Sequence, residues 1–323
     1  MGGLDCVNKM TESTEVFTIN TASSMDLNLP RKDIESQNAN ISQRTRGRLI
    51  TFLIDLPIFI CLLAVIGLFE YGTIPSHKSG FYCNDPALSF PYQGEVVTTP
   101  ILISTLFLLP LVMFVIVEIL VNDEHSKSRY IQGFKQAGWL YRTYLYGILM
   151  NLGIVEVMKG IAGTPRPSFF DLCQPDTAAN CTGSEFVSDF RCTSTYSWWY
   201  RMDSYRSFPS GHTSMSVYCG FFMAWYLQKR AFDWATLSIL AVPVLQFLSI
   251  SYSIICSLTR ITDRRHHWWD VLAGTVVGFI TLVYAVIFLG DNFTVRRTRD
   301  PSEVKMEESQ HTVRTLLYEE QRS

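Results

Sequence analysis

Long apolar stretches alternate with polar segments through the middle of the chain. Six stretches reach the length of about 20 apolar residues that an α-helix needs to cross the hydrocarbon of a bilayer. They run from residues 49 to 71, 100 to 121, 139 to 158, 210 to 228, 236 to 258 and 271 to 289. The fourth is the least apolar, because it is short and rich in small polar residues. This pattern predicts an all-α integral membrane protein with six transmembrane helices.

Two mostly polar segments flank these spans. Residues 1–48 and 290–323 show no sustained hydrophobic period that could build a core, so we expect two disordered tails around a six-span core at residues 49–289. No short apolar stretch with a cleavage site lies near Met1. We therefore expect the first span to remain in the protein as a signal anchor.

The charge of the chain is nearly balanced, and its distribution predicts an orientation. The 323 residues include 27 Lys and Arg against 29 Asp and Glu, a net charge of −2, which argues against a polybasic nucleic-acid binder. Six spans place both tails on one face of the membrane. That face would carry 18 of the basic residues and the opposite face nine. Because Lys and Arg collect on the cytoplasmic side, we expect both tails to be cytosolic.

Four cysteines fall in loops on the opposite, extracytoplasmic side. They are Cys83, Cys173, Cys181 and Cys192, and the last three lie within twenty residues of one another. Disulfides persist on the oxidising side of a membrane, so we expect at least one bridge here, although the spacing does not determine the pairing. The sequon that begins at Asn180 lies in the same loop and is a candidate glycosylation site.

The first candidate motif on this side consists of a lysine and an arginine seven residues later. Lys159 ends the third span, and Arg166 stands between Pro165 and Pro167. The prolines keep the arginine on an extended, stiff backbone. Glu156 lies one helical turn before Lys159 and could pair with it. Taken alone, the same residues are also typical of interfacial anchors at helix ends.

The second element stands at the outer mouth of the fourth span. Here Ser210, Gly211 and His212 follow a proline, at the point where a helix should begin. The free N–H groups and the positive dipole end of that helix favour an anion, Gly211 allows its close approach, and Ser210 adds a hydroxyl. His212 could act as an acid or a base at neutral pH. The alternative is an ordinary serine N-cap with a histidine beside it.

The third element opens the sixth span and combines Arg260, His266 and Asp270. If this stretch is helical, the histidine and the carboxylate four residues later share a face, and the carboxylate can hold one imidazole nitrogen while the other attacks. A metal site formed with His267 is a rival hypothesis, but one loop supplies too few ligands. An aromatic and histidine belt at the membrane interface is the second alternative.

All three elements fall on the same side of the membrane. In order they are Lys-x6-Arg-Pro, Pro-Ser-Gly-His and Thr-Arg-x5-His-x3-Asp. Their combination resembles the signature of the phosphatidic acid phosphatase type 2 superfamily, and specifically that of the eukaryotic lipid phosphate phosphatases. The resemblance covers the six-span core, about residues 48 to 289. One departure is Thr259, which stands where the family usually has serine and keeps a hydroxyl.

The resemblance implies a role for each residue of the motifs. His266 would be the nucleophile and form a phosphohistidine, Asp270 would orient it, and His212 would protonate the departing alkoxide and later activate water. Three fixed cations would neutralise the phosphate oxygens, so we expect neither a metal nor a cofactor. Five residues would bind those oxygens: Lys159, Arg166, Ser210, Gly211 and Arg260.

The implied function is hydrolysis of lipid phosphate monoesters at the extracytoplasmic face. Phosphatidate, lysophosphatidate, sphingosine 1-phosphate and ceramide 1-phosphate are the usual substrates of the family that the chain resembles, and their hydrocarbon chains could stay in the bilayer. A sugar phosphatase of the same fold, a lipid phosphotransferase and a non-catalytic lipid-phosphate binder remain as alternatives. The resemblance implies the plasma membrane, with the endoplasmic reticulum or Golgi as alternatives. Gly274 and Gly278 would seat a neighbouring helix, within the fold or in a homo-oligomer.

Overall fold

The computed structural model describes residues 53–121, 127–232 and 240–294. Within these residues, five helices are long and apolar enough to cross a membrane. They are Leu53–Glu70, Thr99–Val121 (α2), Arg129–Ala162 (within α3), Ala241–Thr262 (α7) and Trp268–Leu289 (α8, Trp268–Tyr284, with the π-helical turn η3, Ala285–Leu289). The protein is therefore a mostly helical integral membrane protein. The predicted disordered tails at residues 1–48 and 290–323 lie outside the described residues, apart from residues 290–294, which include the short helix η4, Asp291–Phe293.

The chain divides into two units at residue 60, within its first long helix. The described part of the first unit, residues 53–60, is helical, and its side chains are exposed. The second unit begins at residue 61 and contains the other helices and the loops between them. All residues of the three sequence motifs lie in this second unit.

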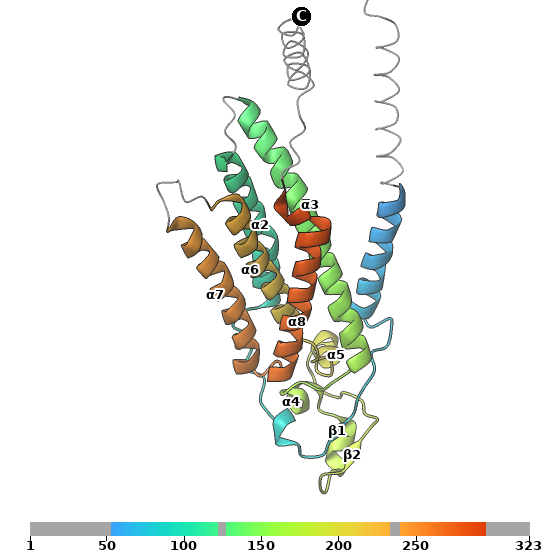
Figure 1. Cartoon of the computed structure of the whole chain (residues 1–323). Helices are drawn as coiled ribbons and strands as arrows, with labels where there is room; N and C mark the ends of the chain where they lie inside the picture. The colour runs from blue at the N-terminus through green and yellow to red at the C-terminus, as the bar shows by residue number, and fades with distance from the viewer. Residues whose placement is uncertain (1–52, 122–126, 233–239, 295–323) are drawn as a thin grey trace, which may run out of the picture. The chain divides into compact units, whose positions relative to one another are not determined.

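The fourth predicted span is the helix α6, Gly211–Arg230, which is not among the five helices of sufficient hydropathy. It packs against α2, α3, α7 and α8 (Figure 1). Thirteen of its 20 residues are buried, including two serines and a threonine. A helix enclosed by other helices has no need of a wide apolar face toward lipid. Its low hydropathy therefore follows from its central position in the bundle.

Two helices extend beyond their predicted limits. The third was predicted from residue 139 to 158, but α3 spans Lys127–Ala162, which places Lys159 in its last turn. The fifth was predicted to end at residue 258, but α7 continues to Thr262 and includes Arg260 in its last turn. Hydropathy detects only the segment in hydrocarbon, whereas a helix can continue into the polar layers where water solvates its ends. Both extensions fall on residues of the sequence motifs.

Small residues seat α8 directly on α6. A methyl group added at Gly274 would lie 2.5 Å from the carbonyl oxygen of Ser210, and one at Gly278 would lie 2.7 Å from that of Ser214. Both distances are shorter than real contacts of a β-carbon, so only glycine allows this approach. The small-residue pair therefore serves packing within the fold, as the first of the two sequence hypotheses proposed.

The loops at one end of the bundle form a layer of short elements, and we call residues 72–98 and 163–210 the loop layer (Figure 1). Its two strands, Phe81–Tyr82 (β1) and Phe186–Val187 (β2), pair antiparallel and join the two loops. The helices of the layer are Pro86–Leu88 (η1), Phe169–Cys173 (α4), Asp176–Asn180 (η2) and Trp198–Asp203 (α5). Asn180, the candidate glycosylation site, is exposed at the end of η2.

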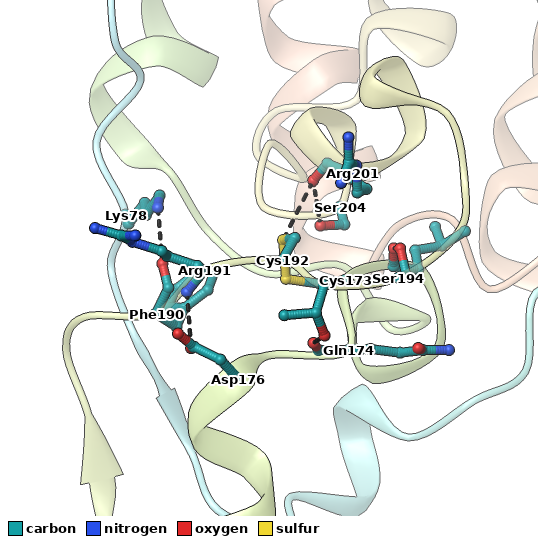
Figure 2. The surroundings of a disulfide bond; sticks show 12 residues. Lys78, Cys173, Gln174, Asp176, Phe190, Arg191, Cys192, Ser194, Arg201 and Ser204 are labelled. Carbon is teal, nitrogen blue, oxygen red and sulfur yellow. Dashed lines mark hydrogen bonds between the residues drawn. A yellow bond between two sulfur atoms is a disulfide. The ribbon is translucent and has the colours of Figure 1, made fainter.

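Two disulfides fasten the loop layer, which confirms the prediction of at least one bridge. Cys83 pairs with Cys181 and thereby links the two loops, and Cys173 pairs with Cys192 within the longer loop. Figure 2 shows the second bridge beside the α5 helix, where Cys192 Sγ lies 3.8 Å from the carbonyl oxygen of Arg201. Such crosslinks restrict the unfolded chain and hold irregular segments that have little core of their own.

Candidate active site

The three sequence motifs meet at the end of the helix bundle that adjoins the loop layer. Most of their polar side chains are buried: Arg166 is 4% exposed, Arg260 1% and His266 3%, and Ser210 and Asp270 are fully enclosed. Charged groups are rarely buried to this degree unless they are paired or functional. The structure thus brings the three motifs together at one buried site, and the face of the membrane on which this site lies stays a prediction.

The Lys159 side chain lies against the start of α6. A methyl group added at Gly211 would lie 3.5 Å from Lys159 Nζ, so the absence of a side chain there leaves room for the ammonium. Ser210 is the N-cap of α6, because its Oγ accepts from the Thr213 N–H at 3.4 Å and from the Thr213 hydroxyl at 3.0 Å. The N-cap hypothesis is thus correct, and the capped helix start also faces a cation.

The Arg166 guanidinium is held by contacts on all sides. Its Nε donates to the carbonyl oxygen of Asp203 at 2.7 Å and its Nη2 to Asp203 Oδ1 at 2.6 Å. Its Nη1 donates to the carbonyl oxygen of Arg265 at 2.8 Å and lies 3.1 Å from His266 Nε2. Although burial opposes it, the charges of Arg166 and Arg265 keep the pKa of Asp203 well below its usual range. This arginine is therefore fixed in position before any ligand arrives.

The contacts of His266 define its tautomer. A guanidinium can only donate, so Nε2 of His266 must accept from Arg166 and the ring proton resides on Nδ1. Burial lowers the pKa of His266 well below its usual value, and the charges of Arg166, Arg265 and Lys159 lower it further. The ring is consequently neutral at physiological pH, with its Nε2 lone pair directed toward a cation.

Asp270 lies beside His266, but for a different reason from the one predicted. The stretch is not helical, because α7 ends at Thr262 and α8 begins at Trp268, so His266 lies in the connecting turn. Asp270 folds back from the first turn of α8, and its Oδ2 accepts from the His267 N–H at 2.9 Å. The same oxygen lies 3.7 Å from His266 Nδ1. Helix capping, and not a shared helical face, brings the pair together.

Ser207 completes the link between the carboxylate and the imidazole, and no motif in the sequence pointed to this residue. Its hydroxyl donates to Asp270 Oδ2 at 2.6 Å and lies 3.5 Å from His266 Nδ1. Because the Ser207 hydroxyl donates its hydrogen bond to the carboxylate, its oxygen can accept a hydrogen bond from the Nδ1–H group of His266. Both Ser207 and Asp270 therefore favour the tautomer in which Nε2 is unprotonated.

His212 and Arg260 each have a buried side-chain nitrogen without a hydrogen-bond partner among the described residues. His212 occupies the first turn of α6, and its buried Nε2 has no hydrogen-bond partner among the described residues. Arg260 binds Glu95 Oε2 at 3.2 Å, the carbonyl oxygen of Val97 at 2.9 Å and Asp263 Oδ2 at 3.1 Å, all through its terminal nitrogens. Its Nε is buried and unpaired within the same described residues. Buried groups of this kind are expected where a ligand completes the hydrogen bonding.

A surface hollow opens beside His266. Its volume is about 380 Å³, and its lining includes Phe90, Pro167, Ile261 and Trp268 next to the histidine. These side chains are apolar, which suits contact with a lipid better than with a soluble sugar. No group of three or more His, Cys, Asp or Glu that could hold a metal lies within residues 53–121, 127–232 and 240–294. The metal-site hypothesis for this turn thus gains no support.

Glu156 pairs with Lys159 as predicted, with 2.9 Å between Oε1 and Nζ, and its Oε2 binds Arg206 Nη2 at 2.5 Å. Replacing Glu156 with glutamine is expected to lower kcat/KM about 10-fold or more, because a buried partner that orients a binding group is lost. The measurement is phosphate release together with the thermal midpoint. Glu118→Gln is the matched control, since Glu118 is equally buried but binds Arg230 at the far end of α6. Equal losses of kcat/KM in both variants would contradict an orienting role.

Comparison with known proteins identifies the class to which this site belongs. A family model described as the PAP2 superfamily matches residues 140–294. Phospholipid phosphatase 1 of Mus musculus is 31% identical over 243 residues, which cover 73% of this chain and 82% of the relative. Phospholipid phosphatase 2 of Rattus norvegicus is 29% identical over 225 residues, which cover 68% and 79%.

A third relative, of lower identity, matches a longer stretch of the chain. A putative phosphatidate phosphatase of Drosophila melanogaster is 28% identical over 268 residues, which cover 76% of this chain and 70% of the relative. No solved structure was found to match the chain. The bundle and its cationic site thus define a membrane-embedded phosphatase. The chain belongs to the PAP2 superfamily and is a phosphatase of the lipid phosphate class.

Proposed function

We propose that the protein hydrolyses lipid phosphate monoesters without a metal, through a phosphohistidine on His266. The observation that carries the proposal is the state of this ring. It is buried and neutral, its Nδ1–H faces Asp270 and Ser207, and its Nε2 lone pair lies 3.1 Å from a fixed guanidinium. A phosphate bound to that guanidinium would present its phosphorus to Nε2.

The first step transfers the phosphoryl group to the protein. Nε2 of His266 attacks phosphorus and the bond to the ester oxygen breaks, while His212 gives its proton to the departing alkoxide. Asp270 stabilises the positive charge that develops on the imidazole, as in the base-and-orienter arrangement of a catalytic triad. Five groups neutralise or bind the equatorial oxygens: Lys159, Arg166, Arg260, the Ser210 hydroxyl and the Gly211 amide.

The second step releases phosphate. His212, now unprotonated, takes a proton from a water molecule, and the resulting hydroxide attacks phosphorus and breaks the bond to Nε2. The proton that His212 gave to the alcohol is thereby replaced, and the ring of His266 returns to its neutral state. Each step thus balances within the groups of this site, with water as the only co-reactant.

The substrate class follows from the relatives and from the surroundings of the site. Relatives named phospholipid phosphatase and phosphatidate phosphatase support phosphatidate, lysophosphatidate, sphingosine 1-phosphate and ceramide 1-phosphate as substrates. The apolar hollow beside His266 and the exposed Trp268 and Trp269 support contact with lipid at headgroup depth. Among the described residues, no observation favours a sugar phosphate or a non-catalytic role.

We infer six spans, with α6 as the fourth, and a site on the extracytoplasmic face. The enclosed position of α6 supports its role as a span despite its low hydropathy. The excess of 18 over nine basic residues and the two disulfides of the loop layer support cytosolic tails. A glycosylated Asn180 and a plasma membrane location agree with this orientation, with the endoplasmic reticulum or Golgi as alternatives.

The test is phosphate release from phosphatidate by the purified full chain in detergent micelles with excess chelator. We expect release at the same rate with and without the chelator, because fixed cations of the protein take the place of a metal. Loss of release that added metal restores would contradict the metal-independent mechanism. Release from glucose 6-phosphate but not from phosphatidate would favour the sugar phosphatase instead.

A further inference from the structure

A chain of alternating charges links two of the proposed phosphate-binding arginines. Asp203 binds Arg166 through Oδ1 at 2.6 Å and Arg265 through Oδ2 at 2.5 Å. Glu95 continues from there, with its Oε1 2.9 Å from Arg265 Nε and its Oε2 3.2 Å from Arg260 Nη1. We call these five residues the ion chain: Arg166, Asp203, Arg265, Glu95 and Arg260.

The ion chain joins segments that are far apart in the sequence. Glu95 comes from the loop that precedes α2, Asp203 from the end of α5, and Arg265 from the turn between α7 and α8. Its side chains are little exposed, from 1% for Arg260 to 15% for Asp203. Buried ion pairs interact more strongly than surface pairs, and removing one partner leaves an uncompensated charge. The spacing of the two arginines therefore depends on both carboxylates.

The ion chain also determines which donor of Arg260 remains available. Glu95, Val97 and Asp263 take the terminal nitrogens, and the buried Nε has no partner among the described residues. At the other end, Asp203 binds Nε of Arg166 through its carbonyl oxygen and Nη2 through its carboxylate, while Nη1 donates to the carbonyl oxygen of Arg265 and faces His266 Nε2. Arg260 thus keeps a donor for an oxygen atom on the side away from its carboxylates, and Arg166 is oriented so that its Nη1 faces the ring of His266.

We propose that Glu95 is a positioning residue for phosphate binding. It holds Arg260 directly, and through Arg265 and Asp203 it sets the distance between Arg260 and Arg166. Glu95 itself does not touch the phosphate, since a carboxylate would repel the anion. The inference rests on the proposed function, in which both arginines bind phosphate oxygens.

The test compares Glu95→Gln with the unmodified full chain in detergent micelles. We expect the inhibition constant for inorganic phosphate and the KM for phosphatidate to rise about 10-fold or more, the size typical of lost supporting contacts. We expect kcat to fall less, because the contacts of His266 do not include Glu95. Glu185→Gln is the matched control, since Glu185 is an exposed carboxylate of the loop layer whose side chain, among the residues that the structure describes, binds Thr182 and Gly183 and no arginine of the site.

The inhibition constant separates positioning from folding. A fold defect lowers the amount of active protein but leaves the inhibition constant of the active molecules unchanged, and that result would overturn the proposal. If Glu95→Gln does not fold, Glu95→Asp retains the charge on a shorter side chain and should show a smaller rise. An unchanged constant in Glu95→Asp would then overturn the proposal.

A second measurement separates this inference from the proposed function. Phosphate that binds the native state raises the thermal midpoint, with or without turnover. If the unmodified chain releases no phosphate from phosphatidate, the proposed function fails, yet the midpoint shift still reports phosphate affinity. A smaller shift in Glu95→Gln than in Glu185→Gln supports the positioning role, and equal shifts overturn it.

Discussion

Replacing His266 with alanine is expected to abolish phosphate release, with a loss of at least about 10⁴-fold. The variant lacks the nitrogen that attacks phosphorus in the first step of the mechanism, while the cations that bind phosphate stay in place. The rate is measured as phosphate released from phosphatidate in micelles. A second measurement is the acid-labile phosphoenzyme formed from a labelled substrate, which should be absent in the variant.

The neighbouring histidine provides the control for this prediction. His267 stacks on Trp269 with 4.5 Å between ring centroids, and it binds Asp270 through its backbone N–H, which alanine retains. His267→Ala should therefore keep the turn and most of the activity. Full activity in His266→Ala would falsify the phosphohistidine mechanism. Equal losses in the two variants would show that the turn acts through its structure alone.

The sequence predicts the helices that face lipid better than the helix that they enclose. The spans near α2, α7 and α8 stand out because many of their apolar side chains are exposed, even in α7, whose buried face carries serines. The helix α6 was marginal because its buried face carries residues such as Ser214 and Ser216, which bond to neighbouring groups. Hydropathy measures preference for lipid, so it underestimates a helix whose neighbours are other helices.

The proposed catalytic residues were recognisable in the sequence because their chemistry and spacing are unusual in a membrane protein. The residues that hold them were not. Glu95 and Ser207 lie in irregular loops and Asp203 ends the short helix α5, so no periodicity relates these positions to one another. Their partners are distant in the sequence: Glu95 and Arg260 are 165 residues apart. Such contacts depend on how the loops fold over the bundle, and only the structure shows that.

The proximity of His266 and Asp270 was predicted from a helical spacing that the turn does not have. The prediction of contact nevertheless holds, because residue N3 of a helix can fold back to the N-cap backbone. A spacing of four residues is thus compatible with two local structures. They differ in consequence, since the cap lets one oxygen of Asp270 serve the helix, Ser207 and the imidazole together.

Replacing His212 with alanine is expected to slow hydrolysis of phosphatidate by about 10² to 10⁴-fold, the usual contribution of a general acid or base. The departing alkoxide of a glycerolipid is strongly basic and needs a proton as the bond breaks. An aryl phosphate has a far better leaving group, so its first step should be nearly insensitive to the change. The measurement compares both esters in the unmodified chain and in His212→Ala.

The second step of the reaction provides a more specific kinetic test of the role of His212. His212 is also the base that activates water. In the variant, an aryl phosphate should therefore still phosphorylate His266, but water should remove the phosphoryl group only slowly. We expect a burst of phenol release, followed by a slow steady rate, together with accumulated phosphohistidine. His77→Ala, which alters another histidine near the loop layer, should show neither. Equal losses for both esters without a burst would show that His212 shapes the site and transfers no proton.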